Sequence, residues 1–356
     1  MKRPTLFSTL ALGGRRDATA GRRAKADNAY YVGPRSDHFD GRLFFNPEGK
    51  EPASFADLLR WQFGGGKVKW PAEWPSPHPQ AKPEPRLAPE ALRVTMIGHA
   101  SLLIQVGGLN FLTDPVWSQR VSPFSFAGPK RVNAPGIAFD DLPPIDYVLL
   151  THNHYDHMDA TTLARLKTAR DPHVITPLGN DVIVGRAAPG IRISTHDWHE
   201  RIDIGDGVAV HVEPAHHWSA RGTGDRRMAL WSAFTIETSV GHVYFGGDTG
   251  FHEGRNYDLA RNRHGGFRLA ILPIGAYEPR WFMEPHHQNP EEAVAGFRLL
   301  GAEHAAGIHW GTFRLTDEAV DEPRERLHAA LDAEGIARER FRALQPGEVW
   351  DVPPLA

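Results

Sequence analysis

The chain beyond residue 90 alternates short apolar runs with turn residues and helical stretches. The apolar runs predict strands, and Gly107-Gly108 predicts a tight hairpin between two of them. Strands mixed with helices predict an α/β fold in which helices cover the sheets and sites lie at strand ends. The predicted strands cover 93–97, 102–106, 109–113, 147–150, 173–176, 208–213, 230–238, 242–245, 269–272 and 305–309, and the predicted helices cover 161–169, 290–300 and 324–333.

The first 90 residues follow a different pattern. Ser54 caps a predicted helix over 55–63, and three glycines end it. Seven prolines between 71 and 89 predict an extended strap that takes no part in a sheet. We therefore predict an N-terminal extension and strap, residues 1–90, packed on a core domain, residues 91–356. Residues 1–25 hold seven basic side chains and one acid, which predicts a disordered tail or an arm drawn to anionic lipid headgroups.

Composition removes several classes of function. The 40 Lys and Arg are balanced by 43 Asp and Glu, a net charge of -3, so no basic field favours nucleic acid. The chain has no cysteine, which excludes disulfides, thiolate-bound zinc and cysteine nucleophiles. No apolar run suits a signal peptide or a membrane span. We expect a cytoplasmic protein, with peripheral attachment to the inner membrane face as an alternative.

The 20 histidines need a chemical explanation, and the informative segment is residues 151–157. It follows an apolar strand and contains His152, His154, Asp156 and His157. In extended backbone, residues two apart share a face, so His152 and His154 can bind one ion. A turn after them would direct Asp156 and His157 towards a second ion. Imidazole and carboxylate suit zinc, and the absence of cysteine suits a catalytic centre. The alternative is a polar loop whose histidines cap backbone groups.

Three further candidates follow other apolar strands. They are His217, Asp248 after Gly246-Gly247, and His309. Each has an ordinary explanation as a hydrogen-bonded histidine, an Asx turn or a core histidine. Their recurrence after strands, in a chain that carries the 151–157 segment, favours ligands in all three places.

These motifs resemble the metallo-β-lactamase superfamily, and within it the N-acyl-phosphatidylethanolamine phospholipase D branch. The resemblance covers residues 94 to about 315. It rests on Gly98-His99-Ala100-Ser101, Leu112-Thr113-Asp114-Pro115, Gly128-Pro129-Lys130-Arg131, the segment 152–159, His217-Trp218-Ser219, Gly247-Asp248-Thr249-Gly250, the block 273–283 and His309-Trp310-Gly311. It implies an αββα sandwich, the metallo-β-lactamase fold, with a dinuclear metal site on one edge.

The resemblance also implies roles for single residues. One zinc ion would be bound by His152, His154 and His217. A second would be bound by Asp156, His157 and His309, and Asp248 would bridge the two. Asp156 and Asp248 would also accept hydrogen bonds from a metal-bridging hydroxide, and Asp114 would orient ligand imidazoles. Tyr155 and His287 would contact the phospholipid.

The implied activity is hydrolysis of N-acyl-phosphatidylethanolamine to N-acylethanolamine and phosphatidic acid. Alternatives are a zinc hydrolase of a soluble lactone or nucleotide phosphodiester, a di-iron redox protein, and a lipid-binding module without turnover. The expected partners are a phospholipid substrate and a peripheral membrane surface. A second copy of the chain, in a homodimer, is a further alternative. A membrane surface would use Trp61, Phe63, Trp70 and Trp74 beside Lys67 and Lys69, although such aromatics can pack onto their own domain instead.

Overall fold

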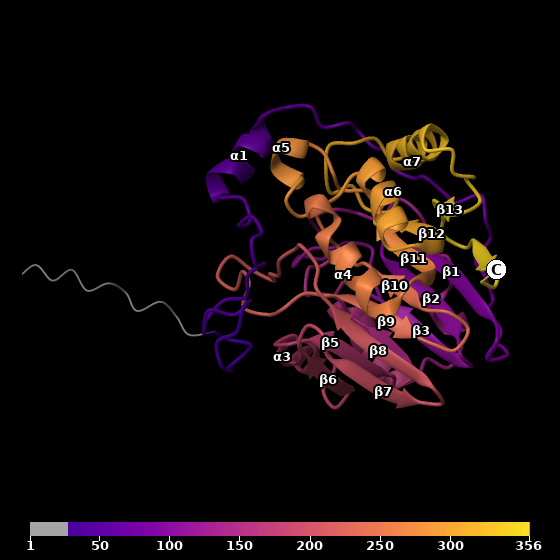
Figure 1. The fold of residues 1–356 in the computed structure, drawn as a ribbon. Helices are drawn as coiled ribbons and strands as arrows, with labels where there is room; N and C mark the ends of the chain where they lie inside the picture. Colours follow the sequence, from indigo (N-terminus) through magenta and orange to yellow (C-terminus); the bar gives the residue numbers. More distant parts are fainter. Residues whose placement is uncertain (1–27, 356) are drawn as a thin grey trace, which may run out of the picture.

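Two seven-stranded sheets lie face to face in the computed structural model, which describes residues 28–355 (Figure 1). Helices cover both outer faces, so the architecture is the αββα sandwich that the sequence predicts. The predicted basic tail, residues 1–25, lies outside the described residues. Within residues 28–355 no helix is long and apolar enough to cross a membrane.

The first sheet carries the segment 151–157, called the histidine segment from here on. Its order is β14-β1-β2-β3-β4-β5-β6; β14-β1-β2-β3 pair antiparallel and β3-β4-β5-β6 pair parallel. All five residues of β3 match the strand predicted for them, and β2 begins one residue earlier than predicted, at Ser101. The strands are β1 (Leu92–Gly98), β2 (Ser101–Val106), β3 (Leu109–Thr113), β4 (Tyr147–Leu149), β5 (His173–Pro177), β6 (Arg192–His196) and β14 (Val349–Asp351).

The second sheet has the order β13-β12-β11-β10-β9-β8-β7. Strands β7 to β10 are antiparallel neighbours, and β10 to β13 are parallel. The strands are β7 (Arg201–Gly205), β8 (Val208–Glu213), β9 (Ala233–Glu237), β10 (Val243–Phe245), β11 (Phe267–Pro273), β12 (Ala302–Ile308) and β13 (Phe341–Arg342). Side chains from both sheets form one continuous apolar core, and the largest of them are aromatic and fully buried.

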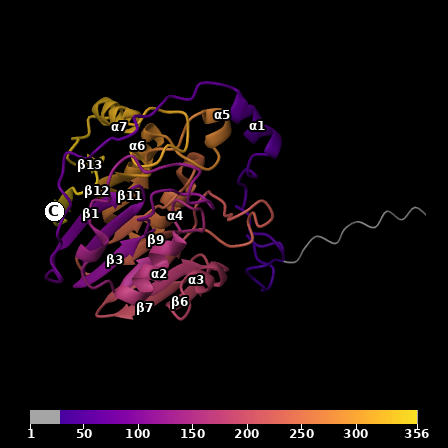
Figure 2. The same cartoon turned by 180° about the vertical axis from the view of Figure 1, so that it is seen from behind.

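The helices divide between the two outer faces. In Figure 2, α2 and α3 lie over the first sheet, and Leu163, Leu166 and Val184 pack on its strands. In Figure 1, α4 and α6 lie over the second sheet, with α7 beside α6. The helices are α1 (Phe55–Phe63), α2 (Ala160–Ala169), α3 (Asp181–Ala187), α4 (Arg255–His264), α5 (Arg280–Met283), α6 (Pro290–Leu299) and α7 (Glu322–Ala333), with 3-10 turns η1 (Phe139–Asp141) and η2 (His252–Gly254).

The residues before β1 run along the outside of the sandwich. The capping box that Ser54 forms with Asp57 starts α1, as the sequence predicts. The proline-rich stretch contains no helix or strand, which confirms the predicted extended strap. It is attached by backbone bonds, since the Trp74 N–H donates to the carbonyl of Val132 at 2.7 Å and the Ala81 N–H to that of Gly136 at 2.7 Å.

Candidate metal centre

The segment that follows β4 forms a tight turn that begins at His154, where the sequence predicts that the chain turns. The N–H groups of His157 and Met158 both donate to the carbonyl of His154, at 3.2 and 2.8 Å. Gly247, with φ +57°, lies against this segment, and a Cβ there would lie 2.7 Å from Thr151 Cγ2. A glycine is therefore required for the chain after β10 to pass so close.

The first group of candidate ligands consists of three imidazole nitrogens. His154 Nδ1 lies 2.9 Å from His152 Nε2 and 3.1 Å from His217 Nε2. Three ligands of one tetrahedral zinc ion lie about 3.3 Å from one another, because each bond is about 2.0–2.1 Å long. The spacing thus suits a common ion. Burial, the main cause, holds the pKa of His152 and His217 well below the usual value and lowers that of His154 to about 4, so all three rings are neutral and can bind metal.

The second group lies beside the first. His309 Nε2 lies 3.2 Å from Asp156 Oδ2, and His157 Nε2 lies 3.6 Å from the same oxygen. Here burial favours the neutral rings, but the carboxylates outweigh it: they hold the pKa of His157 well above its usual range and raise that of His309 to about 9. A divalent cation would supply the positive charge that these two rings otherwise carry as protons.

Asp248 lies between the two groups. Its Oδ2 is 3.1 Å from both His157 Nε2 and His309 Nε2, and 3.7 Å from His217 Nε2. Its Oδ1 is buried without a hydrogen-bond partner. Burial opposes its ionisation, yet His157 and His309 hold the pKa of Asp248 well below the usual value. A buried carboxylate between two sets of ligand atoms, with one oxygen unpaired, fits a ligand shared by two cations.

All seven predicted ligand residues therefore meet at one edge of the sandwich. Their side chains come from both sheets: His152, His154, Asp156 and His157 follow β4, and His217, Asp248 and His309 follow β8, β10 and β12. The clusters of ligand atoms are His99, Asp156, His157, His309; His152, His154, His217; His152, His157, Asp248; and His217, Asp248, His287. This donor set suits a divalent metal site.

Two groups next to the ligands orient them. Asp114 accepts from the Thr151 N–H at 2.8 Å and from the Thr151 hydroxyl at 2.7 Å, and it lies 2.7 Å from His157 Nδ1. His217 Nδ1 donates to the carbonyl of His286 at 3.1 Å. Both contacts leave the Nε2 atom of the ring as the metal-facing lone pair.

The two residues predicted to contact the substrate, His287 and Tyr155, lie in different surroundings. His287 Nδ1 is 4.0 Å from Asp248 Oδ2, so its ring is part of the cluster, and burial lowers its pKa to about 4. The Tyr155 hydroxyl instead donates to the carbonyl of Arg221 at 2.9 Å, and its ring stacks under that guanidinium, 3.7 Å away. Tyr155 also lines a cavity of about 500 Å³ with Phe124 and Arg120.

His99 is a functional candidate to which the sequence assigned no role. It is buried directly after β1, and its Nε2 lies 3.0 Å from Asp156 Oδ2. Its ring centroid is 4.0 Å from that of His309. The motif Gly98-His99 after a predicted strand was the only sequence signal, and a lone histidine there does not reveal a partner 57 residues away.

A second histidine cluster differs from this centre. His264 Nε2 lies 2.6 Å from Glu213 Oε1, and His211 Nε2 lies 2.5 Å from Glu237 Oε2. These separations are those of charge-assisted hydrogen bonds and are shorter than the spacing of two ligands on one ion. Arg263 also donates to Glu213 at 2.7 Å. The cluster is therefore an ion-pair network.

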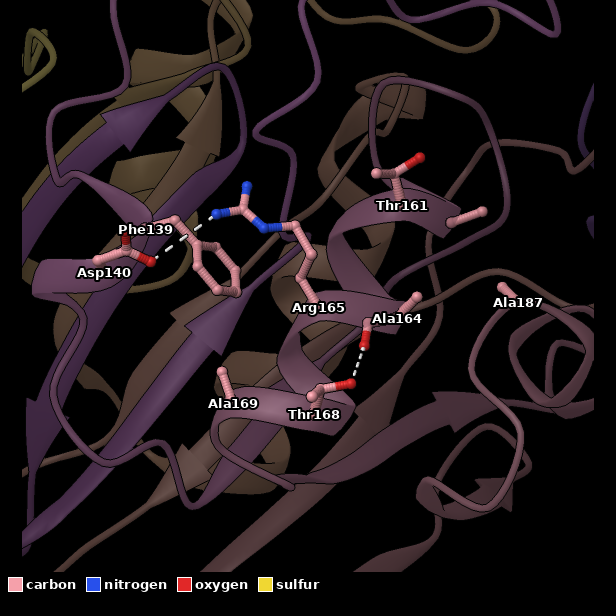
Figure 3. A pocket seen from close by; sticks show the side chains of 9 residues that line it. Phe139, Asp140, Thr161, Ala164, Arg165, Thr168, Ala169 and Ala187 are labelled. Carbon is pink, nitrogen blue, oxygen red and sulfur yellow. Dashed lines mark hydrogen bonds and ion pairs between the residues drawn. The ribbon is translucent and has the colours of Figure 1, made fainter.

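A surface cavity of about 730 Å³ lies between α2, η1 and the end of α3 (Figure 3). Small side chains line most of it, and Arg165 crosses one end, 3.7 Å above the Phe139 ring. No predicted ligand lines this cavity, so it is separate from the metal centre.

Known proteins resemble this chain in sequence and in fold. Residues 109–310 match the family model of the beta-lactamase superfamily domain. An N-acyl-phosphatidylethanolamine-hydrolyzing phospholipase D of Caenorhabditis elegans is 39% identical over 271 residues, 73% of this chain and 76% of that protein. A metal-dependent hydrolase of Pyrobaculum aerophilum is 27% identical over 267 residues, 73% of this chain and 100% of that protein. Other relatives are longer, and the chain spans 65% of one and 52% of another.

Solved structures share the fold. A metallo hydrolase of the archaeon Ignicoccus hospitalis aligns with a TM-score of 0.54 at 19% identity, over 73% of this chain and 98% of that one. At this identity the likeness establishes the architecture alone.

Proposed function

This chain belongs to the β-lactamase superfamily, and from that membership we propose that it is a two-zinc phosphodiesterase that cleaves N-acyl-phosphatidylethanolamine. At the level that the relatives share, it is a metal-dependent hydrolase. The observation that carries the proposal is the position of Asp248, whose single carboxylate faces two separate groups of ligand atoms. The identity to the nematode phospholipase D supports the choice of substrate.

In this proposal His152, His154 and His217 hold one ion, Asp156, His157 and His309 hold the other, and Asp248 holds both. When bound, two such ions make water acidic enough to attack near neutral pH and neutralise charge on the phosphoryl group. Asp114 keeps the His157 ring in the orientation that leaves Nε2 free. His287, which is neutral and 15% exposed, can donate a hydrogen bond to a phosphoryl oxygen.

The reaction is balanced with water as the only co-substrate. The oxygen of water becomes bonded to phosphorus, and the bond between phosphorus and the ethanolamine oxygen breaks. The oxygen that leaves takes a proton and forms the N-acylethanolamine, and phosphatidic acid remains.

Exposed apolar side chains support a membrane-bound substrate. Phe63 is 84% exposed and Phe126 79% exposed. The segments that carry them meet, because Trp61 and Lys67 line one cavity together with Lys130. We define the membrane patch as Leu58, Leu59, Phe63, Phe124 and Phe126 with the cations Arg60, Lys67, Lys69, Arg120 and Lys130. Apolar rings among cations suit the interface of an anionic bilayer.

Of the four aromatic residues that the sequence singled out, only Phe63 is strongly exposed. The indole N–H of Trp61 donates to Asp317 at 3.0 Å and that of Trp70 to the carbonyl of Glu318 at 2.8 Å. Trp74 packs edge-on against Trp310, with centroids 5.7 Å apart. These three attach the N-terminal residues to the domain, and the membrane patch in our proposal uses Phe124 and Phe126 in their place.

The deciding experiment combines elemental analysis of the purified protein with a phospholipid panel assayed for phosphatidic acid. We expect two zinc ions per chain and release from vesicles of N-acyl-phosphatidylethanolamine. Turnover of soluble lactones or nucleotide diesters without any on vesicles would favour the alternative hydrolase. Iron with oxygen reduction would favour the di-iron protein, and vesicle binding without turnover a lipid-binding module.

A further inference from the structure

The N-terminal segment, defined as residues 28–46, reaches the metal centre although it lies outside residues 109–310 that match the family model. It is anchored by Phe39 and Phe44, which are buried with ring centroids 4.6 Å apart. Two chains of hydrogen bonds lead from it towards the centre, one to the backbone of His217 and one to the histidine segment.

The first chain of bonds passes through Asn46. Its Nδ2 donates to the backbone carbonyl of His217 at 2.9 Å, and its Oδ1 accepts from the indole N–H of Trp231 at 3.1 Å. The bond from Trp231, which is 1% exposed, fixes which end of the amide faces His217. Because the His217 ring is already tied to the carbonyl of His286, Asn46 completes the placement of this ligand.

The second chain of bonds begins at Tyr30. Its hydroxyl donates to Asp225 Oδ2 at 2.6 Å, and Asp225 in turn accepts from the N–H groups of Arg221 and Gly222, at 3.1 and 2.8 Å. Asp225 therefore shapes the turn that presents Arg221.

Arg221 then holds the histidine segment. Its Nη1 donates to the carbonyls of Asn153 at 3.1 Å and Met158 at 2.8 Å. These two carbonyls flank His154, Asp156 and His157. The guanidinium also stacks on Tyr155, at 3.7 Å, between the two anchor points. The planar guanidinium of Arg221 thus contacts both ends and the middle of the six residues 153–158. These contacts limit how the turn can bend.

We propose that the N-terminal segment is a positioning element of the metal centre, acting on His217 through Asn46 and on the histidine segment through Tyr30, Asp225 and Arg221. The inference rests on the proposed metal site but not on the identity of the substrate. None of these residues touches the reacting atoms; their role is to hold the ligands where an ion can be retained.

The test measures metal release without substrate. Wild type and variants are loaded with Co²⁺, and a competing chelator is added while the visible absorption of the bound ion is followed. Asn46→Asp is the sharpest variant, because it keeps the acceptor for Trp231 and loses the donor to His217. Its added negative charge would retain a cation, so faster release cannot come from charge. Tyr30→Phe and Arg221→Gln test the second chain of bonds.

We expect metal release to be roughly 10–100-fold faster in Asn46→Asp and Arg221→Gln, with a smaller change in Tyr30→Phe and a shifted absorption band in each. The matched control removes an arginine side chain that lies in the same loop as Arg221 and makes no contact with the ligands. Arg227→Gln serves better here than Arg226→Gln, because Arg226 stacks on Trp218, whose ring packs against the ligand His154. Arg227 lies in this loop, and its Nη1 donates to Glu51 at 2.6 Å. Arg227→Gln should release metal at the wild-type rate.

Wild-type release and absorption in Asn46→Asp and Arg221→Gln would overturn the proposal, as would an equal effect of Arg227→Gln. If Arg221→Gln does not fold, Asn46→Asp and Tyr30→Phe decide, since Tyr30→Phe removes only the hydroxyl that donates to Asp225. Absence of lipid hydrolysis by the wild type, together with faster metal release in Asn46→Asp and Arg221→Gln, would count against the proposed substrate and leave the positioning role in place.

Discussion

His157 Nδ1 lies 2.7 Å from Asp114 Oδ2, and both side chains are completely buried. The contact fixes the ring so that Nε2 faces Asp248 at 3.1 Å. Asp114 itself is bonded to the backbone and hydroxyl of Thr151, at the end of β4. The Asp114 carboxylate thus fixes the His157 ring relative to the end of β4.

Replacing Asp114 with Ala should therefore weaken metal binding without removing a ligand. We expect affinity to fall roughly 10–100-fold, because the His157 ring loses the bond that sets its tautomer. Competition with a chromophoric chelator measures the change. Asp171→Ala removes an exposed carboxylate bonded to Lys167 and should leave affinity unchanged. Unaltered affinity in Asp114→Ala would contradict the orienting role.

Asp248→Asn should lower the turnover number by at least about 100-fold, since a neutral amide holds two cations less well than a carboxylate. Elemental analysis should show fewer than two ions per chain. If Asp248→Asn kept wild-type turnover and two ions per chain, Asp248 would not be a ligand shared by both ions.

Tyr155→Phe should keep two ions per chain, because the lost hydroxyl bonds only to the carbonyl of Arg221. The ring still stacks on the guanidinium. We expect KM for lipid vesicles to change more than the turnover number on a soluble diester; the reverse order would place Tyr155 in the chemistry instead.

Phe63→Ser with Phe126→Ser should weaken binding to anionic vesicles by at least about tenfold, since burying each ring is worth about 1.5–3 kcal/mol. Vesicle flotation measures the loss, and hydrolysis of a soluble diester should stay unchanged. Val32→Ser is the control, because Val32 is 94% exposed and lies outside the membrane patch. Equal losses in the control would mean that any exposed apolar residue contributes alike.

The stability of the protein should depend on pH through His38, which is not one of the predicted ligands. Its ring nitrogens lie 2.6 Å from Asp37 and 2.7 Å from Asp197. Burial favours the neutral ring, but the two carboxylates outweigh it and raise the pKa of His38 above 6.5. Because the folded pKa is the higher one, this contribution is complete below about pH 6.5 and is lost as the pH rises through the raised value.

Urea unfolding at several pH values between about 6 and 9 measures this dependence. His38→Gln removes the charge, so the difference in unfolding free energy between wild type and variant should shrink as the pH rises. A difference that stays constant over this range would show that folding does not raise the pKa of His38.

The sequence predicts this site well because strand ends are easy to recognise. The apolar runs before Thr151 and His309 end where the strands end, so residues far apart in the chain could be assigned to one edge. The predicted strand over 230–238 is too long, since β9 begins only at Ala233. Residues 230–232 continue the apolar run but lie in the loop beside Thr151, to whose carbonyl the Ser232 N–H donates.

Other elements carry no such pattern. In α4 only Tyr257 and Ala260 are buried, and polar or charged residues fill most of the rest, so no apolar stripe predicts the helix. Strand β6 has no fully buried residue. Arg221 lies in an irregular loop, and its contacts are with carbonyls 63 and 68 residues earlier, which leave no trace in local sequence.

Each of the two ions would take ligands from both sheets, as His154 belongs to the first and His217 to the second, and His157 to the first and His309 to the second. A bound pair of ions would thus cross-link the two sheets of the sandwich. Stripping it should lower the melting temperature of the whole molecule rather than loosen a single loop. Newly made chains, in turn, could acquire their ions only after the two halves have closed on each other.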